Sequence, residues 1–280
     1  MNIVSYPNAK VNLGLRIIEK RPDGFHNLET LFVPTGLCDI LEIVTSNIFS
    51  IKHYGLTYSL PDANPEEDLC VRAYRLLQRD YDLPPVEIHL YKKIPVGAGL
   101  GGGSADAAFT LKSLNSLFKL NLSDEALASY AARLGSDCPF FVYNKPMFGE
   151  GRGEILTPYQ APWIDDLFGE KPRYKIETRT FPIHVSTAEA YRGVVPRIPE
   201  VGLEELLRGP ITNWQGSVRN DFEPHIFAAH PAIRSIKESL LDSGALYASM
   251  SGSGSAVFGL FTSQPQLLLD DSLFVHIEQL

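Results

Sequence analysis

The residues with the clearest chemical potential form a glycine cluster, in which five glycines occupy the seven positions from 97 to 103. The alternating run 86–92 before it predicts a strand, and the alanine- and leucine-rich run 105–117 after it predicts an amphipathic helix. Glycines let successive backbone N–H groups converge on one point, and the start of a helix adds further N–H groups and the positive end of its dipole. The stretch therefore predicts a site for an anion, most naturally a phosphate, rather than a flexible linker.

Three phosphate-loop patterns compete for this stretch. The Walker pattern needs a lysine where Gly103 stands. Gly97, Gly99 and Gly102 satisfy G-x-G-x-x-G, but two helices are predicted to follow instead of a strand ending in an acidic residue, and Asp124 is typical of a helix start. The third pattern, Pro-x-x-x-Gly-Leu-x-x-x-Ser over 95–104, fits best.

The composition bounds the class of protein. The chain has 280 residues with 44% hydrophobic and 21% charged side chains, which is typical of a soluble globular protein of one large or two modest domains. Its net charge of −8 argues against a general nucleic-acid-binding surface. The first residues lack the pattern of a signal peptide and no apolar run reaches membrane-spanning length, so we expect a cytoplasmic protein.

The three cysteines, Cys38, Cys70 and Cys138, are odd in number and lack metal-site spacing. We therefore expect buried, reduced thiols rather than disulfides, a metal site or a catalytic thiol.

Alternating and helical periodicities predict an α+β chain with a boundary near residue 157, giving domains 1–157 and 158–280 joined by a proline-rich linker at 158–172. The periodicity also breaks at 61–65. Strands are predicted at 3–6, 10–18, 28–34, 39–44, 136–142, 174–177, 246–250 and 256–261. Further helices are predicted at 66–80, 123–134 and 231–241, with a helix start in 185–191. Residues 262–280 carry no diagnostic pattern.

The strand predicted at 10–18 matters most for chemistry. Its alternation places Val11, Leu13 and Leu15 toward a core, while Lys10 and Asn12 point to the other face.

Four separated segments together resemble the GHMP family of small-molecule kinases: 7–13, 21–26, 95–104 and 250–256. The Pro-Asp-Gly-Phe-His turn and the Ala-Lys-Val-Asn strand resemble the branch that acts on a cytidine-diphosphate-linked methylerythritol in the non-mevalonate isoprenoid pathway. The resemblance spans about residues 1–262. It implies a two-domain GHMP kinase fold, with an N-terminal ribosomal-protein-S5-like domain, a C-terminal ferredoxin-like domain and an active site between the halves.

The resemblance also implies a reaction, in which the γ-phosphoryl group of ATP moves to the 2-hydroxyl of that substrate. Its cofactors are ATP and Mg²⁺, and its partner is the small-molecule substrate, with no nucleic acid and no membrane. Both a monomer and a homodimer are compatible with it.

Residue roles follow from the same resemblance. Asp137 matches the catalytic base, and Lys10 matches the lysine that orients it. Ser104 either faces the magnesium ion or caps the helix. The ATP-binding loop comprises Pro95, Val96, Gly97, Ala98, Gly99, Leu100, Gly101, Gly102, Gly103 and Ser104.

The substrate-binding residues implied by the resemblance read the cytosine and hold the rest of the molecule. His26 reads the edge of the base, while Phe25 and Tyr191 sandwich it. The full set is Asn12, Phe25, His26, Thr187, Tyr191, Gly252 and Gly254.

Plainer interpretations stay open for several of these positions. Thr187 and Tyr191 also fit a helix start with a core aromatic, and Gly252 and Gly254 also fit a tight turn. Lys92 and Lys93 compete as a minor nucleotide contact. Asp68 stands where close relatives would place an adenosine-side Asn.

Three other functions also stay open. The first is a GHMP kinase acting on homoserine, a mevalonate derivative or a sugar. The second is a dinucleotide-dependent oxidoreductase built on G-x-G-x-x-G. The third is a nucleotide-binding module without activity.

Overall fold

A computed structural model describes residues 1–56, 64–161, 163–164, 175–180, 183–263, 265 and 273–279. The chain forms two compact units, and neither is one continuous stretch of sequence. The first unit contains Met1–Ala9, Leu37–Val96 and Gly101–Lys145, and the second contains Lys10–Gly36, Gly97–Leu100 and Pro146–Leu280. The boundary at residue 157 stays a prediction. Most of the predicted linker at 158–172 and of the break at 61–65 lies outside the described residues.

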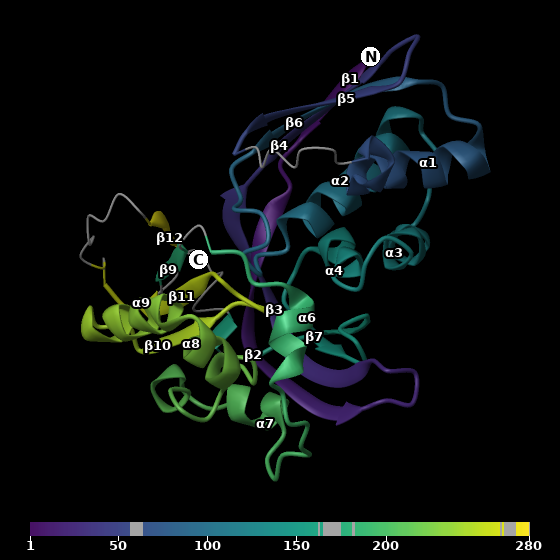
Figure 1. Ribbon diagram of the computed structural model, residues 1–280. Coiled ribbons are helices and arrows are strands. Elements are labelled where there is room, and N and C mark those ends of the chain that lie inside the picture. Colours follow the sequence, from purple (N-terminus) through teal and green to yellow (C-terminus); the bar gives the residue numbers. More distant parts are fainter. Residues whose placement is uncertain are drawn as a thin grey trace. The chain divides into compact units, whose positions relative to one another are not determined.

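The first unit combines one sheet with helices (Figure 1). The sheet has the order β1-β4-β6-β5, with β5 parallel to β6 and the other pairs antiparallel. Its strands are β1 (Asn2–Ser5), β4 (Ile40–Thr45), β5 (Ser50–Gly55) and β6 (Val86–Lys92). Its helices are η1 (Pro65–Glu67), α1 (Leu69–Tyr81), α2 (Gly102–Leu117), α3 (Asp124–Ala132) and α4 (Cys138–Tyr143). Helix α2 packs against the strands β1 and β4 and also against the helices α1, α3 and α4, so it is the central helix of the unit.

Side-chain caps start two of these helices, α3 where the sequence predicts it and α1 three residues later than predicted. Asp68 accepts hydrogen bonds from the backbone N–H groups of Cys70 at 2.8 Å and Val71 at 3.2 Å, which starts α1. Ser123 accepts one from Ala126 and starts α3.

The strand predicted at 136–142 is wrong, because the chain forms helix α4 there. A short apolar run fits a buried strand and a buried helix equally well. Pro139 lies in the first turn of α4, where its fixed φ and missing N–H favour a helix start.

The second unit holds two further sheets, with the orders β2-β3-β7-β8 and β10-β11-β9-β12. The first consists of β2 (Asn8–Lys20), β3 (His26–Cys38), β7 (Met147–Glu150) and β8 (Ile155–Pro158). The second consists of β9 (Lys175–Thr180), β10 (Tyr247–Met250), β11 (Val257–Phe261) and β12 (Phe274–Gln279). No sequence pattern indicated β12.

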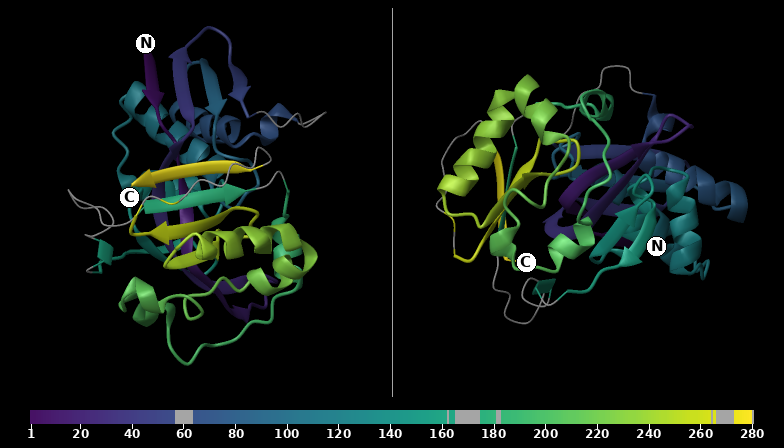
Figure 2. Two further views of the ribbon diagram at one scale, coloured as in Figure 1. Left: turned by 90° about the vertical axis from the view of Figure 1, so that its left-hand side faces the viewer. Right: turned by 90° about the horizontal axis from the view of Figure 1, so that it is seen from below.

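The helices of this unit are α6 (Thr187–Arg192), α7 (Leu203–Leu207), η2 (Ile211–Asn213), α8 (Glu223–Ala229) and α9 (Pro231–Asp242). Helix α9 packs across β10, β11 and β9, as Figure 2 shows. A buried cluster joins this helix, through Ile233 and Leu240, to Leu15 and Ile17 of β2. The early strand β2 therefore contributes to a hydrophobic core of the second unit. The mixture of helices and strands in the two units confirms the predicted α+β class.

Both faces of strand β2 are covered. Val11, Leu13 and Leu15 are buried as expected, but Lys10 and Asn12 are only 2% and 1% exposed. The polar face of this strand is therefore covered, so the lysine is not a solvated surface residue.

Among the described cysteines, Cys70 and Cys138 are buried free thiols as predicted, whereas Cys38 is only half-buried. No helix in the described ranges is long and apolar enough to cross a membrane.

Candidate active site

Residues 97–100 of the first glycine loop lie against a second glycine loop, residues 251–255, and both segments belong to the second unit. The N–H of Ala256 donates to the carbonyl of Ala98 at 2.9 Å, and the Ser251 hydroxyl donates to the carbonyl of Gly99 at 2.9 Å. Gly99 has φ +78°, and a Cβ there would overlap the carbonyl oxygen of Ser251. Only glycine allows this approach, so the first glycine loop also serves to receive the second.

Lys10 is held beside this contact. Its ammonium donates to the Gly99 carbonyl at 2.9 Å and to Asn12 Oδ1 at 2.6 Å. A Cβ on Gly252 would lie 3.4 Å from Lys10 Nζ. The structure thus brings together Lys10, Asn12, Gly99 and Gly252, all of which were predicted as site residues. A buried ammonium that is fixed by oxygen atoms can stabilise negative charge that develops next to it.

Two of the three predicted base-binding residues, His26 and Tyr191, form a second group in the same unit. The rings of His26 and Tyr191 stack with centroids 4.8 Å apart and planes 24° apart, and Tyr191 meets Phe222 edge-on at 4.9 Å. Burial lowers the pKa of His26, and the charge of Lys20 lowers it further, so the neutral imidazole is favoured.

Phe25 and Thr187 occupy different settings. Phe25 is 53% exposed, and the Arg152 guanidinium lies 4.9 Å over its ring. Thr187 begins α6 behind the cap Ser186, and Tyr191 packs partly against the core, as the plainer interpretation of these two residues predicted. The sandwich of a base between Phe25 and Tyr191 stays a prediction.

In the first unit, the glycine stretch passes into α2 earlier than predicted. Gly101 is the N-cap residue, with φ 73°, and Gly102, Gly103 and Ser104 form the first helical turn. Ser104 therefore does not cap the helix.

The Ser104 side chain instead acts on the Cys138 thiol, which follows Asp137 in the chain. Burial raises the pKa of Cys138 to about 11, hydrogen bonding to Ser104 opposes the rise, and the charge of Asp137 adds to it. Asp137 precedes α4 but makes no side-chain capping bond to it. A hydroxyl and a carboxylate thus lie close to one thiol.

A buried ion cluster lies between the end of β6 and α2. The Lys92 ammonium contacts Asp106 Oδ2 at 2.6 Å and also pairs with Asp39. The other oxygen of Asp39 accepts the N–H groups of Lys93 and Ile94, which fixes the chain just before the glycine loop. Burial raises the pKa of Asp106 to about 7, against the pull of Lys92. Lys92 is thus occupied by two carboxylates, a pairing that the sequence did not reveal.

Two more side chains lie near predicted site residues. His184 was not predicted; a Cβ on Gly97 would lie 2.6 Å from its Nδ1, so its imidazole packs on the glycine loop. The sequence offers no spacing signal for it. Asp68 caps α1 and pairs with His53 at 3.0 Å, while its role toward a nucleotide stays a prediction.

Oxygen donors of the first unit suit a magnesium ion. Among the described residues, no three His, Cys, Asp or Glu side chains gather as a metal site. Mg²⁺ is usually held by one or two carboxylates together with substrate phosphates and water. The Ser104 hydroxyl, in the first turn of α2, fits a place in such a set of ligands.

Family models match both halves of the chain. The model described as GHMP kinases N terminal domain matches residues 68–145, and that described as GHMP kinases C terminal matches residues 203–269.

Whole-chain relatives agree with these matches. A 4-diphosphocytidyl-2-C-methyl-D-erythritol kinase from Bacteroides thetaiotaomicron is 50% identical over 269 residues, covering 95% of this chain and 94% of the relative. One of the same name from Cytophaga hutchinsonii is 44% identical, covering 94% of each. A crystal structure of 4-(cytidine 5'-diphospho)-2C-methyl-D-erythritol kinase matches with a TM-score of 0.75 at 33% identity, over 92% of this chain and 90% of that one. A homoserine kinase from C. hutchinsonii matches with a TM-score of 0.65 at 16% identity, over 99% of this chain and 94% of that one, which shows a shared fold.

Proposed function

The chain belongs to the GHMP kinase family, and from that premise we propose that it transfers the γ-phosphoryl group of ATP to the 2-hydroxyl of 4-diphosphocytidyl-2-C-methyl-D-erythritol. The substrate is supported by relatives of that name at 40–50% identity over at least 90% of the chain. This reaction supplies a step of the non-mevalonate route to isoprenoid precursors.

The protein's part in phosphoryl transfer is mainly to position the reactants and neutralise charge. The backbone N–H groups of the glycine loop and of the start of α2 would hold the ATP phosphates. The single observation that carries the mechanism is the Lys10 ammonium, which is 2% exposed and held 2.9 Å from the Gly99 carbonyl. A buried, fixed cation beside a phosphate loop is suited to a negatively charged transition state.

Asp137 serves as the general base in this proposal. Its carboxylate takes the proton from the substrate hydroxyl as the oxygen attacks the γ-phosphorus, and Lys10 orients the carboxylate and stabilises the developing alkoxide. The half-buried position of Asp137, directly before α4, is compatible with this role.

Mg²⁺ would be held by the ATP phosphates together with the Ser104 hydroxyl, where it would neutralise charge on the phosphates. Ser104 presents a hydroxyl at the first turn of α2, and the chain's own contribution is to keep that hydroxyl next to the phosphate loop.

The cytosine is the part of the substrate that His26 and Tyr191 would recognise. A neutral imidazole has both a donor and an acceptor, as the edge of cytosine requires, and the tyrosine ring offers a flat surface for stacking. Asn12, Phe25, Thr187, Gly252 and Gly254 are proposed to complete the substrate site.

A coupled assay of ADP release with a panel of hydroxylated acceptors tests this function. We expect turnover with the cytidylyl methylerythritol, and not with homoserine, mevalonate or a sugar. Preference for one of those acceptors would contradict the proposed substrate, and nicotinamide or flavin binding without ATP turnover would contradict the kinase assignment.

Two variants test the residue roles in the same assay. Asp137→Asn should lose turnover by about 100-fold or more while it still binds ATP, because general-base catalysis contributes roughly 10²–10⁴-fold. Lys10→Met should also reduce kcat. The matched control for Asp137→Asn is Asp124→Asn, in the first turn of α3, which should leave kcat unchanged. Normal turnover in Asp137→Asn would refute the base.

A further inference from the structure

We propose that Asn220 is a positioning residue, which sets the second glycine loop, 251–255, and through it the anchored ammonium of Lys10. The inference rests on the proposed function, because it concerns how the same site is held in its working geometry. Neither the motifs nor the comparisons single out Asn220.

The Asn220 side chain spans the start of the loop. Its amide nitrogen donates to the carbonyls of Met250 and Gly252, both at 2.8 Å, and its oxygen accepts the N–H of Phe222 at 3.0 Å. The side chain is 1% exposed. Two acceptors and one donor surround it, so one orientation of the amide satisfies every neighbour and the opposite orientation satisfies none.

The backbone of the same residue is fixed to the strand that carries Lys10. Leu15 of β2 donates its N–H to the Arg219 carbonyl at 2.9 Å and accepts the N–H of Asp221 at 2.8 Å, forming a parallel bridge with Asn220. Asn220 therefore links β2 directly to the glycine loop, and it fixes the loop relative to the strand.

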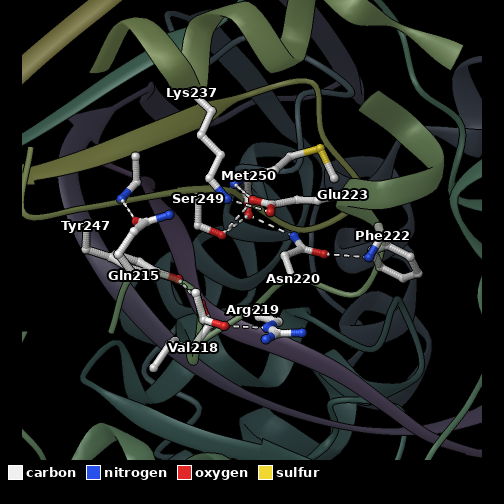
Figure 3. Close-up of polar contacts among 12 residues, drawn as sticks. Gln215, Val218, Arg219, Asn220, Phe222, Glu223, Lys237, Tyr247, Ser249 and Met250 are labelled. Atoms are coloured by element: carbon white, nitrogen blue, oxygen red, sulfur yellow. Dashed lines mark hydrogen bonds and ion pairs between the residues drawn. The ribbon is translucent and has the colours of Figure 1, made fainter. Parts of the chain in front are cut away.

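A buried carboxylate supports the clamp from the next turn of chain. Glu223 accepts the Met250 N–H at 2.9 Å and the Ser249 hydroxyl at 3.1 Å, and it pairs with the Lys237 ammonium at 2.6 Å. Figure 3 shows these donors converging on the carboxylate beside Asn220. Three donors balance the buried charge, so the end of β10 has little freedom to move.

The second glycine loop is connected to Lys10 through the Gly99 carbonyl. Ser251 lies between the two carbonyls that Asn220 holds, and its hydroxyl donates to the Gly99 carbonyl, which also accepts from Lys10 Nζ. A shift of the loop would move the Gly99 carbonyl and the ammonium together. The Asn220 side chain is buried and its amide is bonded to backbone groups, so we expect its effect on catalysis to be indirect.

The test uses Asn220→Asp in the full-length protein. The carboxylate keeps the shape of the side chain but presents an oxygen to two carbonyls, so both hydrogen bonds are lost. Asn115→Asp is the matched control, because Asn115 clamps the backbone N–H and carbonyl of Leu122 in the first unit. Two measurements are made below the unfolding temperature of each variant: hydrogen exchange of the 251–256 amides, and kcat and KM in the ADP-release assay.

We expect Asn220→Asp to speed exchange selectively at 251–256 and to lower kcat by at least about 10-fold, because misplacement of a reacting group by about 1 Å costs on the order of 100-fold. Asn115→Asp should lose stability but keep its kcat. If Asn220→Asp does not fold, Asn220→Ser is measured in the same way, since it is too short to hold both carbonyls.

A folded Asn220 variant with unchanged exchange at 251–256, or with kcat within twofold of wild type, overturns the proposal. So does an equal loss of kcat in Asn115→Asp, which would show a general effect of stability. A wild-type protein that does not phosphorylate the cytidylyl acceptor refutes the proposed function instead, and the exchange measurement still decides whether Asn220 holds the loop.

Discussion

The contact between the two glycine loops gives the sharpest prediction, the substitution Gly99→Ala. Its methyl group would lie 3.0 Å from the carbonyl carbon of Ser251 and 3.1 Å from the nitrogen of Gly254, and closer still to the Ser251 oxygen. All three atoms are backbone, so no side-chain rotation can relieve the overlap. The loops must separate by more than about 1 Å to restore an ordinary contact, and a displacement of about 1 Å already costs roughly 100-fold in rate.

The control must share the backbone strain of Gly99 but not its contact. Gly244 has φ +96°, compared with φ +78° at Gly99, and a Cβ added to Gly244 would meet no atom within 4 Å. Alanine at either site should cost about 1–2 kcal/mol of folding free energy from the left-handed conformation alone. Gly244→Ala should therefore lose stability and keep its turnover.

The assay measures kcat/KM for ADP release and the thermal midpoint of both variants. We expect Gly99→Ala to lose about 100-fold in kcat/KM relative to Gly244→Ala at similar stability. A Gly99→Ala enzyme within threefold of the Gly244→Ala enzyme would refute the argument that the loop contact sets the geometry of the site.

Three further predictions concern charge. Lys92→Met should lower the free energy of unfolding in urea by about 3–5 kcal/mol, because it leaves two buried carboxylates without their cation. The control Lys52→Met removes an exposed ion pair and should leave the urea midpoint unchanged. Equal effects of the two substitutions would contradict the importance of the buried cluster. The wild-type protein should lose stability as the pH rises from about 5 to 8, because the pKa of the Asp106 carboxyl is raised to about 7 in the folded state and is near 3.8 in the unfolded chain. Asp106→Asn lacks this ionisation, so its stability relative to wild type should increase over the same range. A difference in unfolding free energy that stays constant with pH would count against the raised pKa. The KM for the cytidylyl substrate should rise only below pH 6.5, where His26, with its lowered pKa, becomes protonated. His26→Asn should abolish this rise of KM at acid pH. If the variant shows the same rise, His26 is not its origin.

The sequence predicted the parts of the fold that depend on local signals. Ser123 starts the helix predicted after it, and the alternation of Val11, Leu13 and Leu15 identifies a buried strand face. Local signals failed at α4, where a short apolar run has no distinguishing period, and at β12, which lies in a stretch without diagnostic pattern.

The site could be predicted as residue types but not as contacts. Lys10 and Gly99 were both identified, yet nothing local indicates that the carbonyl of one holds the ammonium of the other across 89 positions. Asn220 and the partners of Lys92 were missed for the same reason, because their roles depend on backbone groups and carboxylates brought in by the fold.

The interleaved course of the chain limits how the protein can be divided. Leu15, Ile17 and Leu28 pack in the same buried cluster as Val185, Phe222 and Ile233. A fragment expressed from residue 158 onward would lack β2 and β3 and would expose the apolar surface that these strands cover. Supplying residues 1–157 as a separate polypeptide should cover that apolar surface again. The gene can therefore be split at this point only if both products are made together.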